Sequence, residues 1–152
     1  MVKQNINDVF IAGLRKGWQM GTMNLLPNVI MAFVLIQALN IIGLLKIIGE
    51  LFAPIMSIFS LPGEAMTVLL TSWLSAVGGV GVAASLCTEG ILNSTHISIL
   101  IPGIFLMGGQ LQYMGRILAV AGIEPSHYKV LFLISIMNAA MGMLTMKYII
   151  IH

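Results

Sequence analysis

The chain has 152 residues, of which 59% are hydrophobic and 8% charged, with a net charge of +2 and a mean hydropathy of +1.02. A soluble domain carries about 25% charged residues, so this chain cannot cover a water-facing surface and we expect an integral membrane protein. The charges form no basic patch with interleaved aromatic residues, which argues against nucleic-acid binding. The single cysteine excludes an internal disulfide, and the sequence shows no metal-ligand spacing.

The N-terminal segment 3–23 predicts an amphipathic helix, with Phe10 and Leu14 on its apolar face and Arg15 and Lys16 elsewhere. Trp18 suits an anchor at the membrane interface. We therefore expect residues 1–24 to form an interfacial helix and residues 25–152 to form the membrane domain. The basic residues favour a cytoplasmic N-terminus. The alternative is that this segment only extends the first span.

The next segments predict one span and then two short helices. Residues 25–45 are long and apolar enough to cross a bilayer, and the amides of Gln37 and Asn40 within them are expected to face other helices. The run 44–59 is short and interrupted by charges, and a second short helix is expected over 65–77. The intervening Leu61-Pro62-Gly63-Glu64 is a helix break. Two short helices joined in this way predict a re-entrant hairpin, with Glu64 heading its second helix.

The second half of the chain repeats this pattern of short helix and break. The glycine run 78–81 either packs helices closely or lets a helix unwind. A polar turn near residues 93–96 has Thr95 as the expected N-cap of an apolar run that ends near residue 107. A second break follows at 108–110, and the last and most regular span begins at Pro125 or Ser126. In all we expect an all-α integral membrane protein with about three to five transmembrane helices, a re-entrant hairpin and a second broken helix.

Candidate binding residues lie at the two predicted breaks. A helix N-terminus exposes unpaired N–H groups and carries about half a positive charge, and transporters aim such ends at polar substrate groups. Glu64 could accept hydrogen bonds or hold a cation, and Arg116 could neutralise an anion or pair with Glu64. Helix capping, helix packing and headgroup contact are the structural alternatives. The candidate substrate- or ion-binding residues are Pro62, Gly63, Glu64, Gly108, Gly109, Gln110, Gln112 and Arg116.

These motifs carry a resemblance to a known family. Leu61-Pro62-Gly63-Glu64-Ala65, with the run 78–81 and Met107-Gly108-Gly109-Gln110, resembles the nucleoside-recognition, or Gate, domain family, and within it the spore maturation protein B and YjiG-type bacterial inner-membrane proteins. Segment 24–29 and the run from Arg116 share the likeness, which covers nearly the whole chain. It implies half of a concentrative-nucleoside-transporter-like fold, with a companion subunit of the spore-maturation-A or YjiH type supplying the other repeat.

The resemblance also implies site residues. In such transporters an acidic loop at a hairpin tip touches substrate, and Glu64-Ala65 is similar to the core of that loop. Met66 stands where the family pattern has proline, and Gln110-Leu111-Gln112 stands where spore maturation B relatives have Ser, Thr or Asp character. The carry-over of substrate specificity is therefore incomplete.

Two functions remain open from the sequence. The first is a subunit of an inner-membrane transporter for a small polar solute held at the broken-helix tips. The second is a non-transporting structural or assembly protein of envelope or spore maturation. No nucleophile–base pair stands out, so we expect no enzyme activity, and no cofactor or metal. The expected partners are membrane lipid, a companion Gate-domain subunit or further copies of this chain, and the solute.

Overall fold

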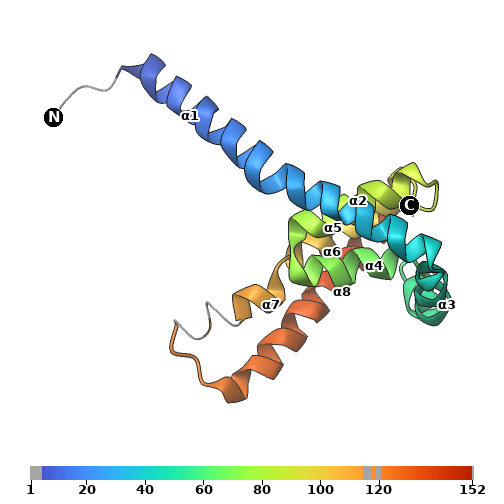
Figure 1. Cartoon of the computed structure of the whole chain (residues 1–152). Helices are drawn as coiled ribbons and strands as arrows, with labels where there is room; N and C mark the ends of the chain where they lie inside the picture. The colour runs from blue at the N-terminus through green and yellow to red at the C-terminus, as the bar shows by residue number, and fades with distance from the viewer. Residues whose placement is uncertain (1–4, 115–117, 119–120, 152) are drawn as a thin grey trace.

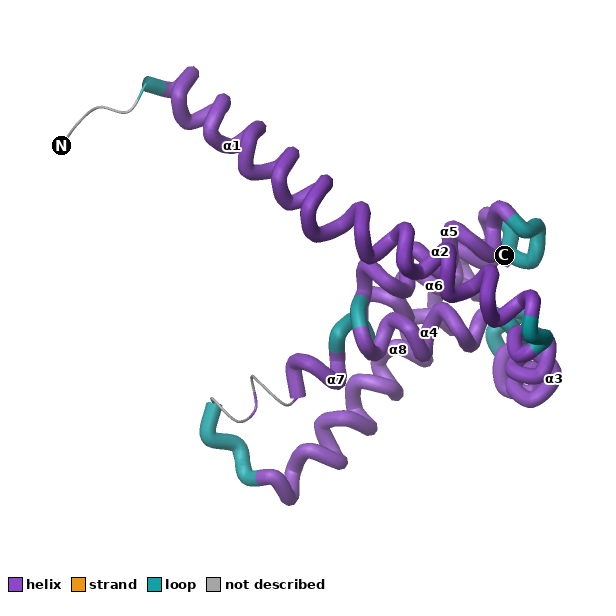
Figure 2. The backbone as a smooth tube through the Cα atoms, viewed as in Figure 1, coloured by secondary structure: helices purple, strands orange, loops and turns teal. Residues whose placement is uncertain are grey.

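The computed structural model describes residues 5–114, 118 and 121–151, and all regular secondary structure in these residues is helical, as the sequence predicts. Figure 1 shows a cluster of short helices from which one long rod projects toward the N-terminus. The rod comprises α1 (Ile6–Met20), the π-helical η1 (Gly21–Leu25) and α2 (Leu26–Ile41), and it forms one uninterrupted tube in Figure 2. Helix α1 buries none of its residues. A position of residues 1–24 at the membrane interface stays a prediction.

The π-helical turn has a local cause. Pro27 lies two residues after the end of η1 and has no N–H to donate to the preceding turn, and a missing bond of this kind favours a wider helical turn. The rod ends at a turn in which Gly43 adopts a left-handed φ of 75°.

The predicted break before Glu64 is confirmed. Helix α3 (Leu44–Ser57) and helix α4 (Ala65–Leu74) are separated by a turn over residues 58–64. The turn is closed by backbone bonds from Leu61 N–H to the Met56 oxygen and from Ala65 N–H to the Pro62 oxygen. Lys147 of the last helix, α8 (Tyr128–Ile151), donates to the carbonyl oxygen of Ile58 at 2.7 Å, which occupies a carbonyl at the end of α3 that has no helical donor.

The predicted helix over 65–77 is wrong at its C-terminal end. Helix α4 stops at Leu74, Ser75 is extended with φ −161° and ψ 125°, and helix α5 (Ala76–Thr88) starts immediately afterwards. The Ser75 hydroxyl accepts from Gly78 N–H at 3.3 Å and so caps the new helix. The following glycines stay helical and buried, so they serve close packing of α5 against α4.

Helix α6 (Ser94–Leu106) begins with a capping box. The side chain of Asn93 accepts from His96 N–H at 2.9 Å, while the Asn93 N–H donates to His96 Nδ1 at 3.4 Å. The expectation that Thr95 is the cap is wrong, because Asn93 already satisfies this end. Beyond the second break lie α7 (Gln110–Tyr113), the 3₁₀ turn η3 (Pro125–His127) and α8 (Tyr128–Ile151).

The core forms where α4 packs on α5 and α6, and where α6 packs on α8. Helix α2 lies along α5, and Asn40 donates to Glu89 at 3.0 Å across this contact, as expected of an amide that faces another helix. Gln37 is exposed on α2. The largest fully enclosed side chains are Met56, Leu86, Ile99, Leu100, Met143, Val68, Val82 and Ser72.

Among the described residues one helix, Pro125–Ile150, is long and apolar enough to cross a membrane. Three apolar helices are shorter, spanning Ala65–Leu74, Ala76–Thr88 and Ser94–Leu106. The sequence predicts about three to five spans. The described part of the chain has fewer full-length candidates because the break at Ser75 and the break before Gln110 divide its apolar sequence into short helices.

A first prediction concerns the approach of α3 to the turn before α4. A methyl group at Gly63 would overlap the carbonyl oxygen of Gly49, so Gly63→Ala must push α3 and α4 apart. We expect a loss of about 1–3 kcal/mol in the free energy of unfolding, measured by SDS titration in mixed micelles. Gly13→Ala is the control, because nothing lies within 4 Å of that position. Equal stability of the two variants would contradict the close approach.

Candidate functional site

Helices α4 and α5 form a helical hairpin whose tip is Ser75. Because the turn between the two helices is a single extended residue and the helices pack along each other, the chain reverses direction at this point. Gly78 and Gly79 make the reversal possible: a Cβ at Gly78 would lie 3.1 Å from the Thr71 methyl, and a Cβ at Gly79 would overlap the Ser72 hydroxyl. The tip therefore depends on small residues on α5 facing hydroxyl residues on α4.

The second helix break meets this tip. After α6 ends at Leu106, Gly109 turns the chain with φ 69° and ψ 15°, a left-handed conformation that favours glycine. The Gly109 N–H donates to the carbonyl oxygen of Ser72 at 2.7 Å. Gly108 lies directly against the other side of the tip, since a Cβ there would be 2.6 Å from the Cβ of Ala76. We call the contact between residues 72–76 and residues 107–110 the junction.

Gln110 is the buried polar residue of the junction. It begins α7, has 7% of its surface exposed, and donates from Nε2 to the carbonyl oxygen of Phe132 on α8 at 3.2 Å. A carbonyl can only accept, so this bond fixes which way the amide points. The amide oxygen Oε1 is buried and has no hydrogen-bond partner among the described residues.

A second unsatisfied group lies beside the same phenylalanine. The ring of Trp73 packs on the ring of Phe132 with centroids 5.5 Å apart and planes tilted by 44°. Its indole Nε1–H is buried and unpaired among the described residues. Two unpaired groups therefore lie beside Phe132: the Gln110 amide oxygen on α7, which lacks a donor, and the Trp73 indole N–H on α4, which lacks an acceptor.

A cavity of about 270 Å³ opens next to Gln110, between the α6–α7 segment and α8. Ser135 on its α8 wall donates to the carbonyl oxygen of Leu106 at 3.1 Å, which ties the end of α6 to α8. The described lining contains no charged side chain. It consists of Leu106, Gly108, Gln110, Tyr113, Met114, Leu118, Leu131 and Ser135.

Glu64 lies at the opposite end of α4. Its half-buried carboxylate rests on α3, where a Cβ at Gly49 would be 2.6 Å from Oε1. The carboxylate itself makes no hydrogen bond or ion pair within the part of the chain that the structure describes, whereas the Glu64 backbone oxygen accepts from the Thr67 hydroxyl at 2.6 Å. Eight residues of helix separate Glu64 from Ser72, which is a rise of about 12 Å. The two predicted helix breaks therefore lie at opposite ends of α4 and do not contact each other.

The predicted site residues fall into two groups in the structure. Pro62, Gly63 and Glu64 lie together at the α3–α4 turn, and Gly108, Gly109 and Gln110 lie together at the junction. Gln112 is in α7. Arg116 lies outside the described residues, so its pairing with Glu64 stays a prediction.

Sequence reasoning missed Ser72, Trp73 and Ser75, and it missed Phe132 on α8. Ser75 carried one usable signal, a serine three residues before the glycine whose N–H it caps. The other three residues carry none, because an apolar or hydroxyl residue within an apolar helix pattern looks like any other core position.

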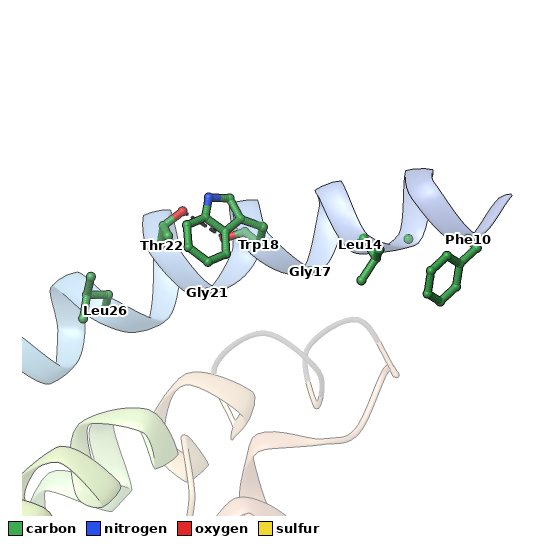
Figure 3. Close-up of a pocket in the computed structure, with 8 residues that line it drawn as sticks. Phe10, Leu14, Gly17, Trp18, Gly21, Thr22 and Leu26 are labelled. Carbon is green, nitrogen blue, oxygen red and sulfur yellow. Dashed lines mark hydrogen bonds between the residues drawn. The ribbon is translucent and has the colours of Figure 1, made fainter. Parts of the chain in front are cut away.

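A groove of about 740 Å³ runs along the projecting rod, shown in Figure 3. Its glycines leave the helix surface hollow, and one hydroxyl, that of Thr22, is turned back onto the Trp18 carbonyl at 2.9 Å. The groove lies on the rod alone, away from the junction, and offers almost no hydrogen-bonding chemistry. It is lined by Phe10, Gly13, Leu14, Gly17, Trp18, Gly21, Thr22 and Leu26.

The fold and the junction define an all-α membrane protein built around broken helices. Residues 22–150 match the nucleoside recognition (Gate) family profile, and the chain belongs to this family. It is similar to inner membrane protein YjiG of Escherichia coli strain K12, with 44% identity over 149 residues that cover 98% of this chain and 97% of that protein. The YjiG protein of Escherichia coli O157:H7 gives the same values. These relatives place the chain in the bacterial inner membrane.

A more distant relative covers only part of the chain. The uncharacterized protein MJ0880 of Methanocaldococcus jannaschii is 31% identical over 94 residues, which are 62% of this chain and 30% of that protein. No solved structure matches the chain significantly.

A second prediction tests the hairpin tip. Ser75→Ala removes the hydroxyl that accepts from Gly78 N–H, and we expect the free energy of unfolding in mixed micelles to fall by about 0.5–2 kcal/mol. Ser94→Ala is the matched control, because Ser94 is exposed at the start of α6 and Asn93 caps that helix. If both variants unfold alike, Ser75 is not the cap.

Proposed function

We propose that the chain is a subunit of an inner-membrane transporter for a small polar solute, which is held at the junction. The hydrogen bond from Gly109 N–H to the Ser72 oxygen carries the proposal, because it brings two helix breaks together. Within a bilayer, irregular backbone is tolerated only where protein buries it or where it lines a cavity. Secondary transporters place such breaks at their substrate sites.

The lengths of the helices support a re-entrant arrangement. Helix α4 has 10 residues and helix α5 has 13, which correspond to about 15 Å and 20 Å. The hydrocarbon core of a bilayer is about 30 Å thick, so neither helix crosses it alone. We propose that the α4–α5 hairpin enters the membrane from one side and returns, with Ser75 at depth. This arrangement fits half of a concentrative-nucleoside-transporter-like fold.

The family description nominates the first solutes to test. The matching profile is described as nucleoside recognition, so neutral nucleosides are the natural starting point. We further propose that a companion Gate-domain subunit or further copies of this chain complete the solute pathway. The proposal involves no catalytic step.

A third prediction concerns Glu64. The Glu64 carboxylate is half-buried and unpaired within the described residues. We propose that it forms a second polar binding position on the solute pathway, about 12 Å from the junction. Glu64→Gln keeps the shape and removes the charge, so we expect uptake of labelled uridine to fall at least about tenfold while membrane insertion is unchanged. Uptake is to be measured in cells that co-express a candidate companion Gate-domain subunit.

Glu50→Gln is the matched control for this substitution. Glu50 is an exposed acid on α3 whose carboxylate lies 3.9 Å from Lys46, and an exposed pair of this kind contributes little. We expect its uptake to equal that of the unaltered protein. Full uptake by the Glu64→Gln variant would remove Glu64 from the mechanism.

A fourth prediction separates transport from a purely structural role. In a Cys87→Ser background, a thiol introduced by Leu131→Cys lines the cavity beside Gln110 of the junction, whereas one introduced by Leu133→Cys lies on the exposed apolar surface of α8. We expect a water-soluble maleimide to label the first position and not the second, because a solute pathway is wet and a lipid-facing surface is not. Protein mass after labelling of intact vesicles gives the readout.

The alternative function predicts a different result. If the chain is a structural or assembly protein of the envelope without transport, the junction is dry and neither thiol reacts. Absence of labelling at both positions, with both variants inserted normally, would favour that alternative over the transport proposal.

A further inference from the structure

The junction contains an amide oxygen that the described chain leaves without a donor. Gln110 is 7% exposed, and its Nε2 is already committed to the Phe132 carbonyl oxygen at 3.2 Å. Because that bond fixes the orientation of the amide, Oε1 cannot be exchanged with Nε2 to find a partner. A buried unsatisfied polar atom costs about 1–3 kcal/mol, so a group in this position usually has a ligand or a water as its partner.

The surroundings of this oxygen indicate what that partner is. The adjoining cavity of about 270 Å³ has room for a small molecule and not only for a single water. Its described walls are apolar apart from the Gln110 amide and the hydroxyls of Tyr113 and Ser135. An ion would be desolvated there without a counter-charge from the described lining, which is costly. The walls therefore suit an uncharged molecule.

We propose, resting on the transport function proposed above, that Gln110 Oε1 accepts a hydrogen bond from an O–H or N–H group of an uncharged solute bound in this cavity. The oxygen is covered in the present arrangement, so the solute reaches it when α7 shifts about the Gly109 turn. The Gln110 amide then links the solute to α8, because its Nε2 keeps the hydrogen bond to the Phe132 carbonyl oxygen.

The unpaired Trp73 indole provides a local reporter of this event. Its ring contacts Phe132, whose carbonyl holds Gln110, so a displacement of α7 changes the environment of the indole. The chain has two tryptophans, and Trp18→Phe removes the one on the projecting rod, where it is exposed. In that background all tryptophan fluorescence reports on the junction.

The experiment titrates the full-length Trp18→Phe protein in nanodiscs with uridine, a neutral molecule that carries both O–H and N–H donors, and with uridine monophosphate as the charged comparison. We expect a saturable change in Trp73 fluorescence with uridine and none with the monophosphate. Gln110→Leu should weaken uridine binding about tenfold, the effect of losing one buried hydrogen bond. Gln37→Leu, which alters an exposed amide on α2, should bind normally.

A second variant guards against a folding defect in Gln110→Leu. Leu131→Phe narrows the cavity from α8 without altering the amide or adding a tryptophan, and it should also weaken uridine binding. Far-UV circular dichroism checks that both variants keep their helices. No saturable change with uridine in the parent protein, or unaltered binding in both variants, would overturn the inference.

Uptake measurements separate this inference from the proposed function. If Gln110→Leu leaves the apparent affinity of uridine uptake unchanged, the site assignment is wrong while transport stands. If the parent protein binds uridine in a Gln110-dependent manner but no uptake is found with the companion, transport is wrong while the binding site stands.

Discussion

The bond between Gly109 N–H and the Ser72 carbonyl oxygen is the contact on which the rest of the structure depends. Ending α4 at Leu74 removes the helical donor that the Ser72 oxygen would otherwise have, and turning the chain at Gly109 frees an N–H. Hydrocarbon offers neither group a partner. The unpaired N–H at one break therefore bonds to the unpaired carbonyl oxygen at the other, and this bond requires α4, α5, α6 and α7 to meet at the junction.

The hydrogen bond between the two breaks also determines which chemical groups line the site. The two breaks bring together backbone, hydroxyls and one buried amide, while Glu64 lies about 12 Å away at the other end of α4. A binding site at the junction is thus uncharged in its described lining, and the Glu64 carboxylate lies at a separate point. The separation explains why the solute proposal centres on hydrogen bonding through Gln110 rather than on charge.

Local signals account for what the sequence predicted well. Proline and glycine mark the breaks at residues 60–64 and 107–109, and the pattern of apolar residues marks the helices around them. Ser75 was missed because a single serine in an apolar run does not by itself end a helix, and its capping role needs Gly78 to pack against Thr71. The hydrogen-bond partner of Asn40 could not be predicted from the sequence either, since Glu89 is 49 positions away.

The sequence alone determined that this is an all-α membrane protein with two interruptions of its apolar helices, because composition and residue order are sufficient for hydropathy and helix breaking. Only the tertiary structure decided which interruptions meet. The α6–α7 break docks on the Ser75 tip, not on the Glu64 turn, because the choice depends on backbone groups left unpaired at Ser72 and on the small residues that let Gly108 reach Ala76. Such complementarity exists only between surfaces brought together by folding.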